Sequence, residues 1–158
     1  MRTAVAAALG GLMLAAPAAA ADYAVIRQDI VVERSADHVW ARVGANYCGL
    51  GEWLKVKCVY TSGSGDVGTM RRIADRIDEV MVAKTPHSYT YAQPTSAILY
   101  HGTLGVEPID KKRSRIVYTL FYDQEPLGTA EARLADRTRR AATFKTALAT
   151  MKAMAEAR

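Results

Sequence analysis

The last part of the chain, residues 128–158, constrains the fold more than any other segment. It contains no proline and is rich in residues that favour helices. Its apolar residues recur at helical spacing and form one stripe: Leu134, Ala141, Phe144, Leu148, Met151 and Ala155. A long helix with a single apolar stripe must bury that stripe against another layer, and the preceding strands offer the largest surface. The sequence therefore predicts a long C-terminal helix that lies on a sheet.

The middle of the chain has the composition of an antiparallel sheet. Residues 23–33 are rich in β-branched side chains and roughly alternate, as a half-buried strand does. Six further strand segments are predicted from residue 56 onward: KVKCVYTSG, GTMRRIADRI, EVMVAKT, SYTYAQ, LYHGTLGVEPI and SRIVYTLFYD. Short turns rich in glycine, proline and aspartate separate them, and short connections join antiparallel neighbours. We expect a meander.

Two short helical segments are expected between the first and second strands. Ser35 offers a hydroxyl for a helix N-cap, and Asp37 lies in the first turn, where the helix dipole favours a negative charge. Gly44, Gly49 and Gly51 then interrupt any longer helix. No repeat or domain boundary is evident after the N-terminal segment, so we expect a single domain over residues 22–158.

Residues 1–21 have the pattern of a signal peptide. Arg2 supplies the basic start, residues 4–16 form a short apolar core, and residues 19–21 are small residues suited to cleavage. The apolar run is shorter than the roughly 20 residues that span a bilayer. We expect cleavage after Ala21 and export as a soluble periplasmic or secreted protein. An uncleaved anchor at the membrane surface is the alternative.

Charge and motifs argue against several classes of function. Loss of Arg2 would lower the formal net charge from +5 to +4, and the basic residues are dispersed. Together with export, this dispersed charge disfavours a nucleic-acid partner. The three histidines, His38, His87 and His101, are too widely spread to predict a metal site. No serine-hydrolase set or phosphate loop stands out, and we expect neither a metal nor a cofactor.

The chain has two cysteines, Cys48 and Cys58. Their separation of ten positions matches neither the close pairs of zinc sites nor the two-residue spacing of a redox pair. In an exported protein a disulfide is the favoured interpretation, and two buried free thiols are the alternative. A disulfide that closes so short a loop stabilises a protein by roughly 2 to 3 kcal/mol.

The order of these elements resembles the helix-grip fold of the START and birch-pollen-allergen superfamily, also called SRPBCC. The segment IVVERSADHVWARVG, residues 30–44, is similar to the family's opening strand and helix. The segment NYCGLGEWLKVKC, residues 46–58, resembles the bacterial "polyketide cyclase/dehydrase" branch, in which a cysteine, an acidic residue beside a Trp and a second cysteine recur. Further similar segments extend the resemblance over nearly all of residues 25–155.

The resemblance has two departures and one clear implication for the fold. The family's usual proline in the opening is Ala36 here, and Leu54-Lys55 replaces the His-Pro that often follows the Trp. The second change removes a polar group from the mouth of the family's pocket. The resemblance implies an α+β fold in which a curved antiparallel sheet of about six to seven strands wraps around the C-terminal helix, with two short helices after the first strand.

The resemblance also implies a cavity between sheet and helix for an apolar or aromatic molecule. Strand alternation places tyrosines in pairs on common faces, where ring and hydroxyl suit such a ligand. The candidate ligand-binding residues are Trp53, Arg71, Tyr89, Tyr91, Tyr100, Tyr118 and Tyr122. The alternative role of Trp53 is to anchor its loop in the core. The alternative for the tyrosines is that they are ordinary strand residues, half of them at the surface. Either Arg71 or Arg72 points inward, and a surface ion pair with Glu79 is the alternative to a buried one.

Three functions are compatible with this sequence. The first is an exported binding or carrier protein for an apolar, aromatic or lipid-like molecule. The second is a cyclase or dehydratase, for which Glu79 and His101 are the candidate acid–base residues and tyrosines hold an enolate. Nothing in the sequence marks these groups as convergent, so binding is favoured over catalysis. The third is an accessory protein that docks another exported protein.

Overall fold

The computed structural model describes residues 22–157, so the expected signal peptide, residues 1–21, lies outside the described residues. The described chain has the α+β architecture predicted from the sequence. Its elements are β1 (Tyr23–Val32), α1 (Ala36–Val43), α2 (Leu50–Leu54), β2 (Cys58–Ser62), β3 (Met70–Ile73), β4 (Ile77–Thr85), β5 (Ser88–Ala92), β6 (His101–Pro108), β7 (Ser114–Asp123), the 3₁₀ helix η1 (Glu125–Leu127) and α3 (Ala130–Glu156).

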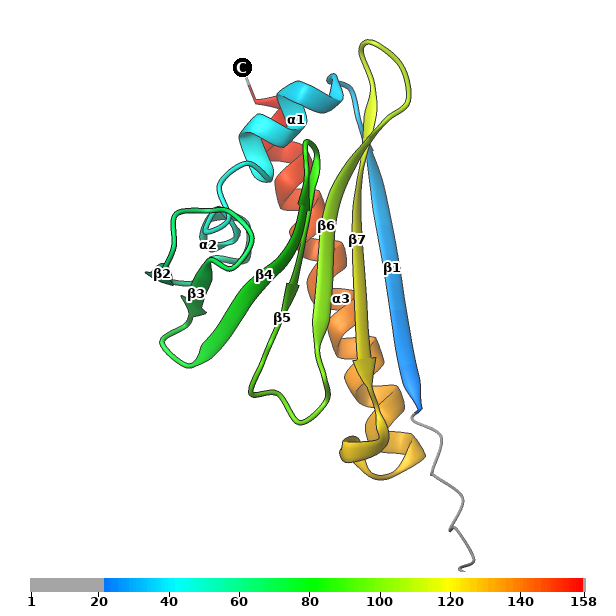
Figure 1. The fold of residues 1–158 in the computed structure, drawn as a ribbon. Helices are drawn as coiled ribbons and strands as arrows, with labels where there is room; N and C mark the ends of the chain where they lie inside the picture. The colour runs from blue at the N-terminus through cyan, green and yellow to red at the C-terminus, as the bar shows by residue number, and fades with distance from the viewer. Residues whose placement is uncertain (1–21, 158) are drawn as a thin grey trace, which may run out of the picture.

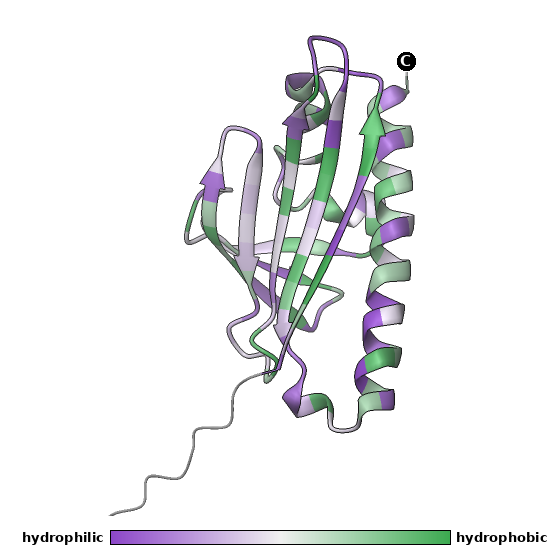
Figure 2. Ribbon diagram, turned by 90° about the vertical axis from the view of Figure 1, so that its right-hand side faces the viewer, coloured by the Kyte–Doolittle hydropathy of each residue, from purple (hydrophilic) through white to green (hydrophobic). Residues whose placement is uncertain are grey.

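The seven strands form one antiparallel sheet in the order β1-β7-β6-β5-β4-β3-β2. Strands β2 to β7 follow one another as the predicted meander, and β1 adds to the end of it beside β7 (Figure 1). The long helix α3 lies on one face of the sheet, and no helix of residues 22–157 lies on the other face (Figure 2). This is the helix-grip arrangement, with the interior enclosed between sheet and helices.

The boundary between β3 and β4 differs from the prediction. The segment GTMRRIADRI was expected to be one strand, but β3 ends at Ile73 and β4 begins at Ile77. Ala74 and Asp75 turn the chain with φ angles of 50° and 58°, a left-handed conformation that alanine seldom adopts. The sequence therefore carries little signal for this turn. Its consequence is a hairpin in which Arg71 is the register partner of Glu79.

The two short helices after β1 are present, as predicted. The Ser35 side chain accepts a hydrogen bond from the backbone N–H of His38 and caps α1. The predicted disulfide also forms: it joins Cys48, just before α2, to Cys58 at the start of β2, with a Cα–Cα distance of 5.5 Å. α2 is thereby fixed beside the short strands at one edge of the sheet.

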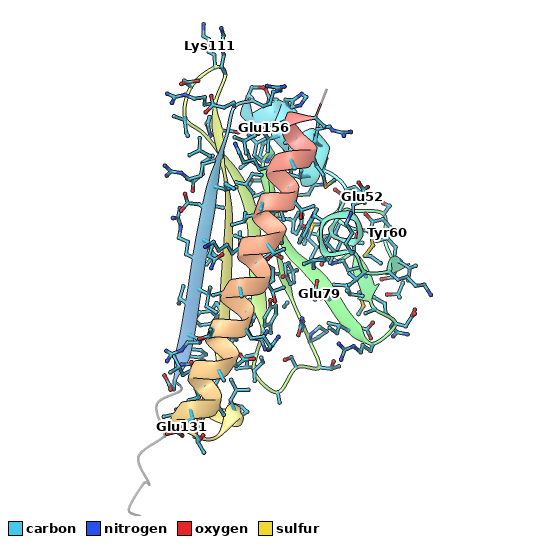
Figure 3. All side chains as sticks on the ribbon, turned by 180° about the vertical axis from the view of Figure 1, so that it is seen from behind. Glu52, Tyr60, Glu79, Lys111, Glu131 and Glu156 are labelled. Atoms are coloured by element: carbon cyan, nitrogen blue, oxygen red, sulfur yellow. A yellow bond between two sulfur atoms is a disulfide. The ribbon has the colours of Figure 1, made fainter. Side chains whose placement is uncertain are left out.

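Helix α3 begins after Thr129, whose hydroxyl accepts a hydrogen bond from the Ala132 N–H. It crosses the sheet face from Glu131 near its first turn to Glu156 near its last (Figure 3). Phe144, Leu148, Met151 and Ala155 of the predicted stripe are buried. Leu134 is 58% exposed, so its place in the buried stripe was predicted wrongly. Within residues 22–157 no helix is long and apolar enough to cross a membrane.

Candidate ligand-binding cavity

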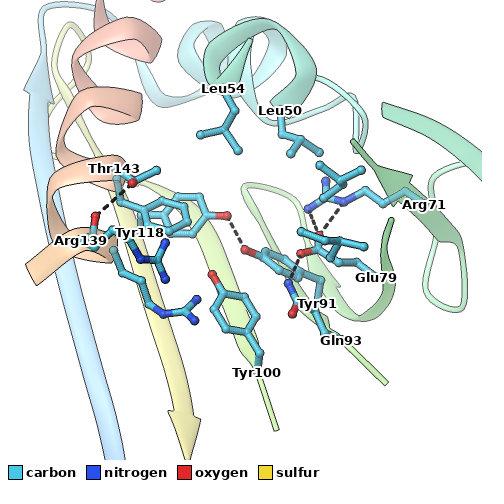
Figure 4. A pocket seen from close by; sticks show the side chains of 14 residues that line it. Leu50, Leu54, Arg71, Glu79, Tyr91, Gln93, Tyr100, Tyr118, Arg139 and Thr143 are labelled. Atoms are coloured by element: carbon cyan, nitrogen blue, oxygen red, sulfur yellow. Dashed lines mark hydrogen bonds and ion pairs between the residues drawn. The ribbon is translucent and has the colours of Figure 1, made fainter. Parts of the chain in front are cut away.

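A cavity of about 160 Å³ lies between the sheet, α2 and the first half of α3 (Figure 4). Its apolar lining is formed by Leu50, Leu54, Ile73, Ile77 and Phe144. Its polar lining, which we call the polar wall, is formed by Arg71, Glu79, Gln93, Tyr91, Tyr100 and Tyr118. Arg139, Arg140 and Thr143 of α3 complete the lining, and we call this part the mouth. Apolar and polar groups therefore line the same space, and the rings of Phe144 and Tyr118 lie 4.4 Å apart between their centroids.

The innermost polar feature is an ion pair between Arg71 and Glu79. The β3–β4 register places the two residues opposite one another. Arg71 lies on the same face of β3 as the buried Ile73, so both side chains of the pair point into the interior. Glu79 Oε2 accepts hydrogen bonds from Arg71 Nε at 2.9 Å and from Nη2 at 2.6 Å. Arg71 Nη1 donates to the Tyr47 carbonyl, and Gln93 Nε2 donates to Glu79 Oε1 at 3.0 Å. The side chains of Arg71 and Glu79 are only 1% and 4% exposed, so partners within the protein replace water.

The surroundings of the pair act on both charges. Burial raises the pKa of Glu79, while Arg71 and the hydrogen bond from Gln93 oppose that rise. Burial lowers the pKa of Arg71, but Tyr89 and Glu79 more than offset this effect and the net change is upward. Arg71 therefore stays charged, and the Glu79 carboxylate balances its positive charge.

Three tyrosines form the rest of the polar wall. The hydroxyls of Tyr91 and Tyr118 are 2.7 Å apart and share a hydrogen bond. Tyr100 packs beside Tyr91 with a ring-centroid distance of 6.2 Å. Burial raises the pKa of Tyr91 and Tyr118 well above the usual value, so both remain neutral phenols that donate and accept hydrogen bonds. Gly102 is required here, because a Cβ atom at that position would overlap the Tyr91 ring.

The mouth is basic. Asp136, one turn earlier on α3, pairs with both Arg139 and Arg140. The Arg140 guanidinium also lies over the rings of Tyr100 and Tyr122, 5.1 Å and 4.7 Å from their centroids. Partial burial raises the pKa of Asp136, but hydrogen bonds from the two arginines outweigh it and hold the pKa below its usual value. Asp136 is therefore ionised, and it balances only one of the two positive charges.

The family of the protein is shown by a match over nearly the whole of the described chain. The model of the family described as "Polyketide cyclase / dehydrase and lipid transport" matches residues 23–156. The chain belongs to this family. The resemblance drawn from the sequence is thus confirmed, and the match includes every strand and helix of the structure.

Solved structures of similar fold include enzymes and proteins named only by their source. The Zhui aromatase/cyclase from Streptomyces sp. R1128 is 19% identical, with a TM-score of 0.66 over 85% of this chain and 94% of that one. Norcoclaurine synthase from Thalictrum flavum, in complex with dopamine and hydroxybenzaldehyde, is 18% identical, with a TM-score of 0.58 over 94% and 99%. A protein from Nitrosospira multiformis is 20% identical, with a TM-score of 0.66 over 82% and 94%. At these identities the likeness shows the fold alone, and no curated protein matches the chain.

The cavity contains some of the residues named from the sequence. Arg71, Tyr91, Tyr100, Tyr118 and Glu79 line it. The remaining three ligand-binding candidates are buried next to it rather than in its lining. The Trp53 ring packs edge-on against Tyr118 at 6.0 Å, Tyr89 lies between Tyr47 and Tyr91, and Tyr122 lies beneath Arg140.

His101 is not brought to the cavity, which corrects its place among the acid–base candidates. In β6 the inward positions are Gly102 and Leu104, so alternation turns His101 to the opposite face of the sheet. There its Nδ1 lies 2.7 Å from the Leu99 carbonyl and its ring packs near Phe121. The structure leaves Glu79 as the acidic candidate in the cavity.

Sequence reasoning missed several lining residues. Gln93 continues the alternation of Tyr89 and Tyr91, so the two-residue alternation of side chains along a strand could have predicted its place in the lining. Arg139 and Arg140 were not named as candidates, because an arginine on a helix usually lies on a solvated surface. Within residues 22–157 no cluster of three His, Cys, Asp or Glu side chains is placed to hold a metal ion.

Proposed function

We propose that the protein binds one small aromatic molecule in the cavity and acts as an exported binding or carrier protein. The observation that carries the proposal is the cavity lining, which combines apolar side chains with several buried polar groups. Binding sites for small molecules combine apolar lining with a few fixed polar groups in this way. The family description, which includes lipid transport, supports a role in holding an apolar molecule.

The size of the cavity limits the ligand. An apolar cavity of about 150 Å³ holds benzene. The cavity here, about 160 Å³, therefore suits a single aromatic ring rather than a polycyclic molecule. Tyr91 and Tyr118 are neutral phenols whose shared hydrogen bond leaves further donor and acceptor capacity for one ligand oxygen. The expected ligand is a monocyclic phenol or aryl carbonyl compound.

Export is the second part of the proposal. The signal-peptide pattern of residues 1–21 supports it, and so does the Cys48–Cys58 disulfide, because disulfides persist in oxidising compartments. We propose that residues 22–158 form the mature protein as a single domain. Mass spectrometry of the protein secreted by its own source tests this, since cleavage after Ala21 gives one defined mass with the disulfide intact. A mass that includes residues 1–21 would contradict it.

Calorimetric titration of residues 22–158 with phenol and 4-hydroxybenzaldehyde tests the binding function. We expect one site per chain, and a Thr143→Trp variant that fills the mouth should weaken binding about tenfold or more, because the ring occupies the ligand's path. Ala149→Trp is the matched control, since Ala149 is exposed on α3 and does not line the cavity. Equal binding by both variants would place the ligand elsewhere, and no binding by the parent protein would overturn the function.

An enzyme of the cyclase or dehydratase kind is the second candidate, because Glu79 is buried in the same cavity as the Tyr91–Tyr118 pair. Its raised pKa suits proton transfer, although both carboxylate oxygens already accept hydrogen bonds. Deuterium exchange next to the carbonyl of an aryl ketone, followed by NMR, tests for this chemistry. Exchange that Glu79→Gln abolishes would support catalysis, and exchange at the rate of the buffer alone would exclude it for that substrate class.

A further inference from the structure

The two ends of the cavity differ in electrostatic character. At the inner end, every guanidinium nitrogen of Arg71 donates to a protein acceptor, and Glu79 balances its charge. A ligand anion there would have to displace the Glu79 carboxylate from two hydrogen bonds. Such hydrogen bonds between charged groups are among the strongest in proteins. The inner end is therefore suited to the uncharged part of a ligand.

The mouth has the opposite character. Arg139 and Arg140 contribute two positive charges and Asp136 one negative charge, which leaves one positive charge in excess. Asp136 is bound by Arg140 through Nε, at 2.6 Å, so the Nη groups of Arg140 extend beyond that contact. The Arg139 side chain is 64% exposed, whereas that of Arg140 is 18% exposed. One arginine thus faces solvent and the other lies against Tyr100 at the entrance to the polar wall.

We infer that the ligand is an aromatic acid whose ring lies among the tyrosines and whose carboxylate meets Arg139 and Arg140 at the mouth. This inference rests on the proposed binding function and adds the charge class of the ligand. Guanidinium groups bind carboxylates with paired, charge-assisted hydrogen bonds, and the excess positive charge at the mouth is the electrostatic complement of one carboxylate. Figure 4 shows Arg139 on the side of the cavity next to Tyr118 and Tyr100, across from Arg71 and Glu79.

The spacing of the two ends adds a size requirement. The cavity takes one ring, at about 160 Å³, so a carboxylate that reaches the mouth must be joined to that ring directly or by a short linker. A hydroxyl on the far side of the ring would then face Tyr91 and Tyr118. 4-Hydroxyphenylacetate has this arrangement and serves as the probe.

Three probes of nearly equal shape separate charge from ring binding. Calorimetry would compare 4-hydroxyphenylacetate, its neutral methyl ester and the cation tyramine, each at low and at physiological salt. We expect the acid to bind about five- to tenfold more tightly than the ester, the range for a partly exposed charge-assisted contact, and tyramine to bind most weakly. The preference for the acid should shrink as salt rises, because the mouth is open to solvent. This comparison uses the parent protein and needs no variant to fold.

Charge variants locate the preference. Arg139→Gln and Arg140→Gln should each reduce the preference for the acid over the ester, whereas Asp136→Asn should increase it. Arg137→Gln is the matched control, because Arg137 is an exposed arginine of the same helix that does not line the cavity. The ester is measured with every variant as well, so that a general loss of ring binding cancels from the ratio of the two affinities, and circular dichroism confirms that each variant has folded.

Each outcome supports or overturns the inference. A preference for the acid that both arginine variants lower and the control keeps would support it. Equal binding of acid and ester, tighter binding of the ester or tyramine, or an equal effect of Arg137→Gln would overturn it while the binding function stands. If the parent protein binds phenol but none of the three probes, the inference alone fails; if it binds neither phenol nor the probes, the proposed function fails as well.

Discussion

The apolar stripe of helix α3 continues along one face through both halves of the helix, but the two halves have different surroundings. Leu134 and Leu148 are 148 − 134 = 14 residues apart, about four helical turns, so their side chains project in nearly the same direction. Leu148 is 2% exposed, whereas Leu134 is 58% exposed. The difference therefore comes from position along the helix and not from the face. We call residues 130–143 the cavity half and residues 144–156 the packed half.

The two halves meet the sheet through different chemistry. The packed half buries Phe144, Ala147, Leu148, Met151 and Ala155 in the apolar core, and α3 packs mainly on β1 and α1. The cavity half buries no residue and reaches the rest of the protein through arginines. Arg133 pairs with Asp22 at 2.7 Å, and Arg140 lies over Tyr100 and Tyr122. The packed half thus stabilises the fold, and the cavity half lines the cavity together with Phe144, the first residue of the packed half.

The largest expected effect concerns the buried tyrosines that surround the cavity. Burial raises the pKa of Tyr47, Tyr89, Tyr91, Tyr100 and Tyr118 in the folded state. Groups with a raised folded pKa stabilise the protein fully below the unfolded pKa, and that contribution is lost as pH rises. One pH unit above an unfolded pKa of about 10, the loss is on the order of 1 kcal/mol for each buried phenol.

Urea unfolding at pH 8 and pH 11 measures this effect, with phenolate absorbance as the independent count of ionised tyrosines. The folded protein should keep these five phenols protonated, and the free energy of unfolding should fall by several kcal/mol in total, at about 1 kcal/mol for each. Tyr118→Phe removes one titrating group and should lessen the fall. Equal stability at both pH values would show that the cavity region is open to water.

Glu79→Ala should have the next largest effect. It leaves the Arg71 charge buried without its partner, which typically costs about 3 to 5 kcal/mol. Chemical unfolding measures the change in free energy. The double variant Arg71→Met with Glu79→Leu is the control and should recover much of the loss, because no unpaired charge remains. A stable Glu79→Ala protein would mean that water reaches Arg71, contrary to its 1% exposure.

Leu148→Ala tests the packed half directly. Truncation of a buried leucine typically costs about 2 to 5 kcal/mol through lost apolar burial and the cavity left behind. Thermal unfolding should show the loss, while calorimetric affinity for the aromatic probe at a temperature where the variant is folded should be unchanged. A variant that keeps its stability but loses binding would reverse the roles assigned to the two halves.

The sequence predicted the elements of the fold better than their edges. Strand composition, turn chemistry and helical periodicity are local properties, and they gave the sheet, the two short helices and the long helix. The turn at Ala74 and Asp75 was missed because alanine rarely adopts a left-handed conformation, so local residue preferences do not predict a turn there. Leu134 was misassigned because periodicity identifies the face of a helix and not where its partner surface ends.

The site was predictable in part for the same reasons. Alternation grouped the tyrosines. Because it places His101 on the face opposite to Tyr100 and Gly102, it was also a usable signal against His101, which was nevertheless named as an acid–base candidate. It could not decide between Arg71 and Arg72, since both have an acidic register partner in β4. The arginines at the mouth depend on how α3 crosses the sheet, which is a tertiary property that a single sequence does not encode locally.

Leu134→Ala should have the smallest effect and completes the comparison, because it repeats the Leu148→Ala change on the same face of the same helix. At 58% exposure Leu134 has little apolar burial to lose, and alanine favours helix slightly more than leucine does. We expect a change in stability within about 0.5 kcal/mol, as for ordinary surface substitutions, and unchanged affinity for the probe. Urea unfolding of the two variants side by side measures the difference. A loss as large as that of Leu148→Ala would mean that the cavity half buries Leu134 in solution, and the helix would then have one continuous apolar contact instead of two distinct halves.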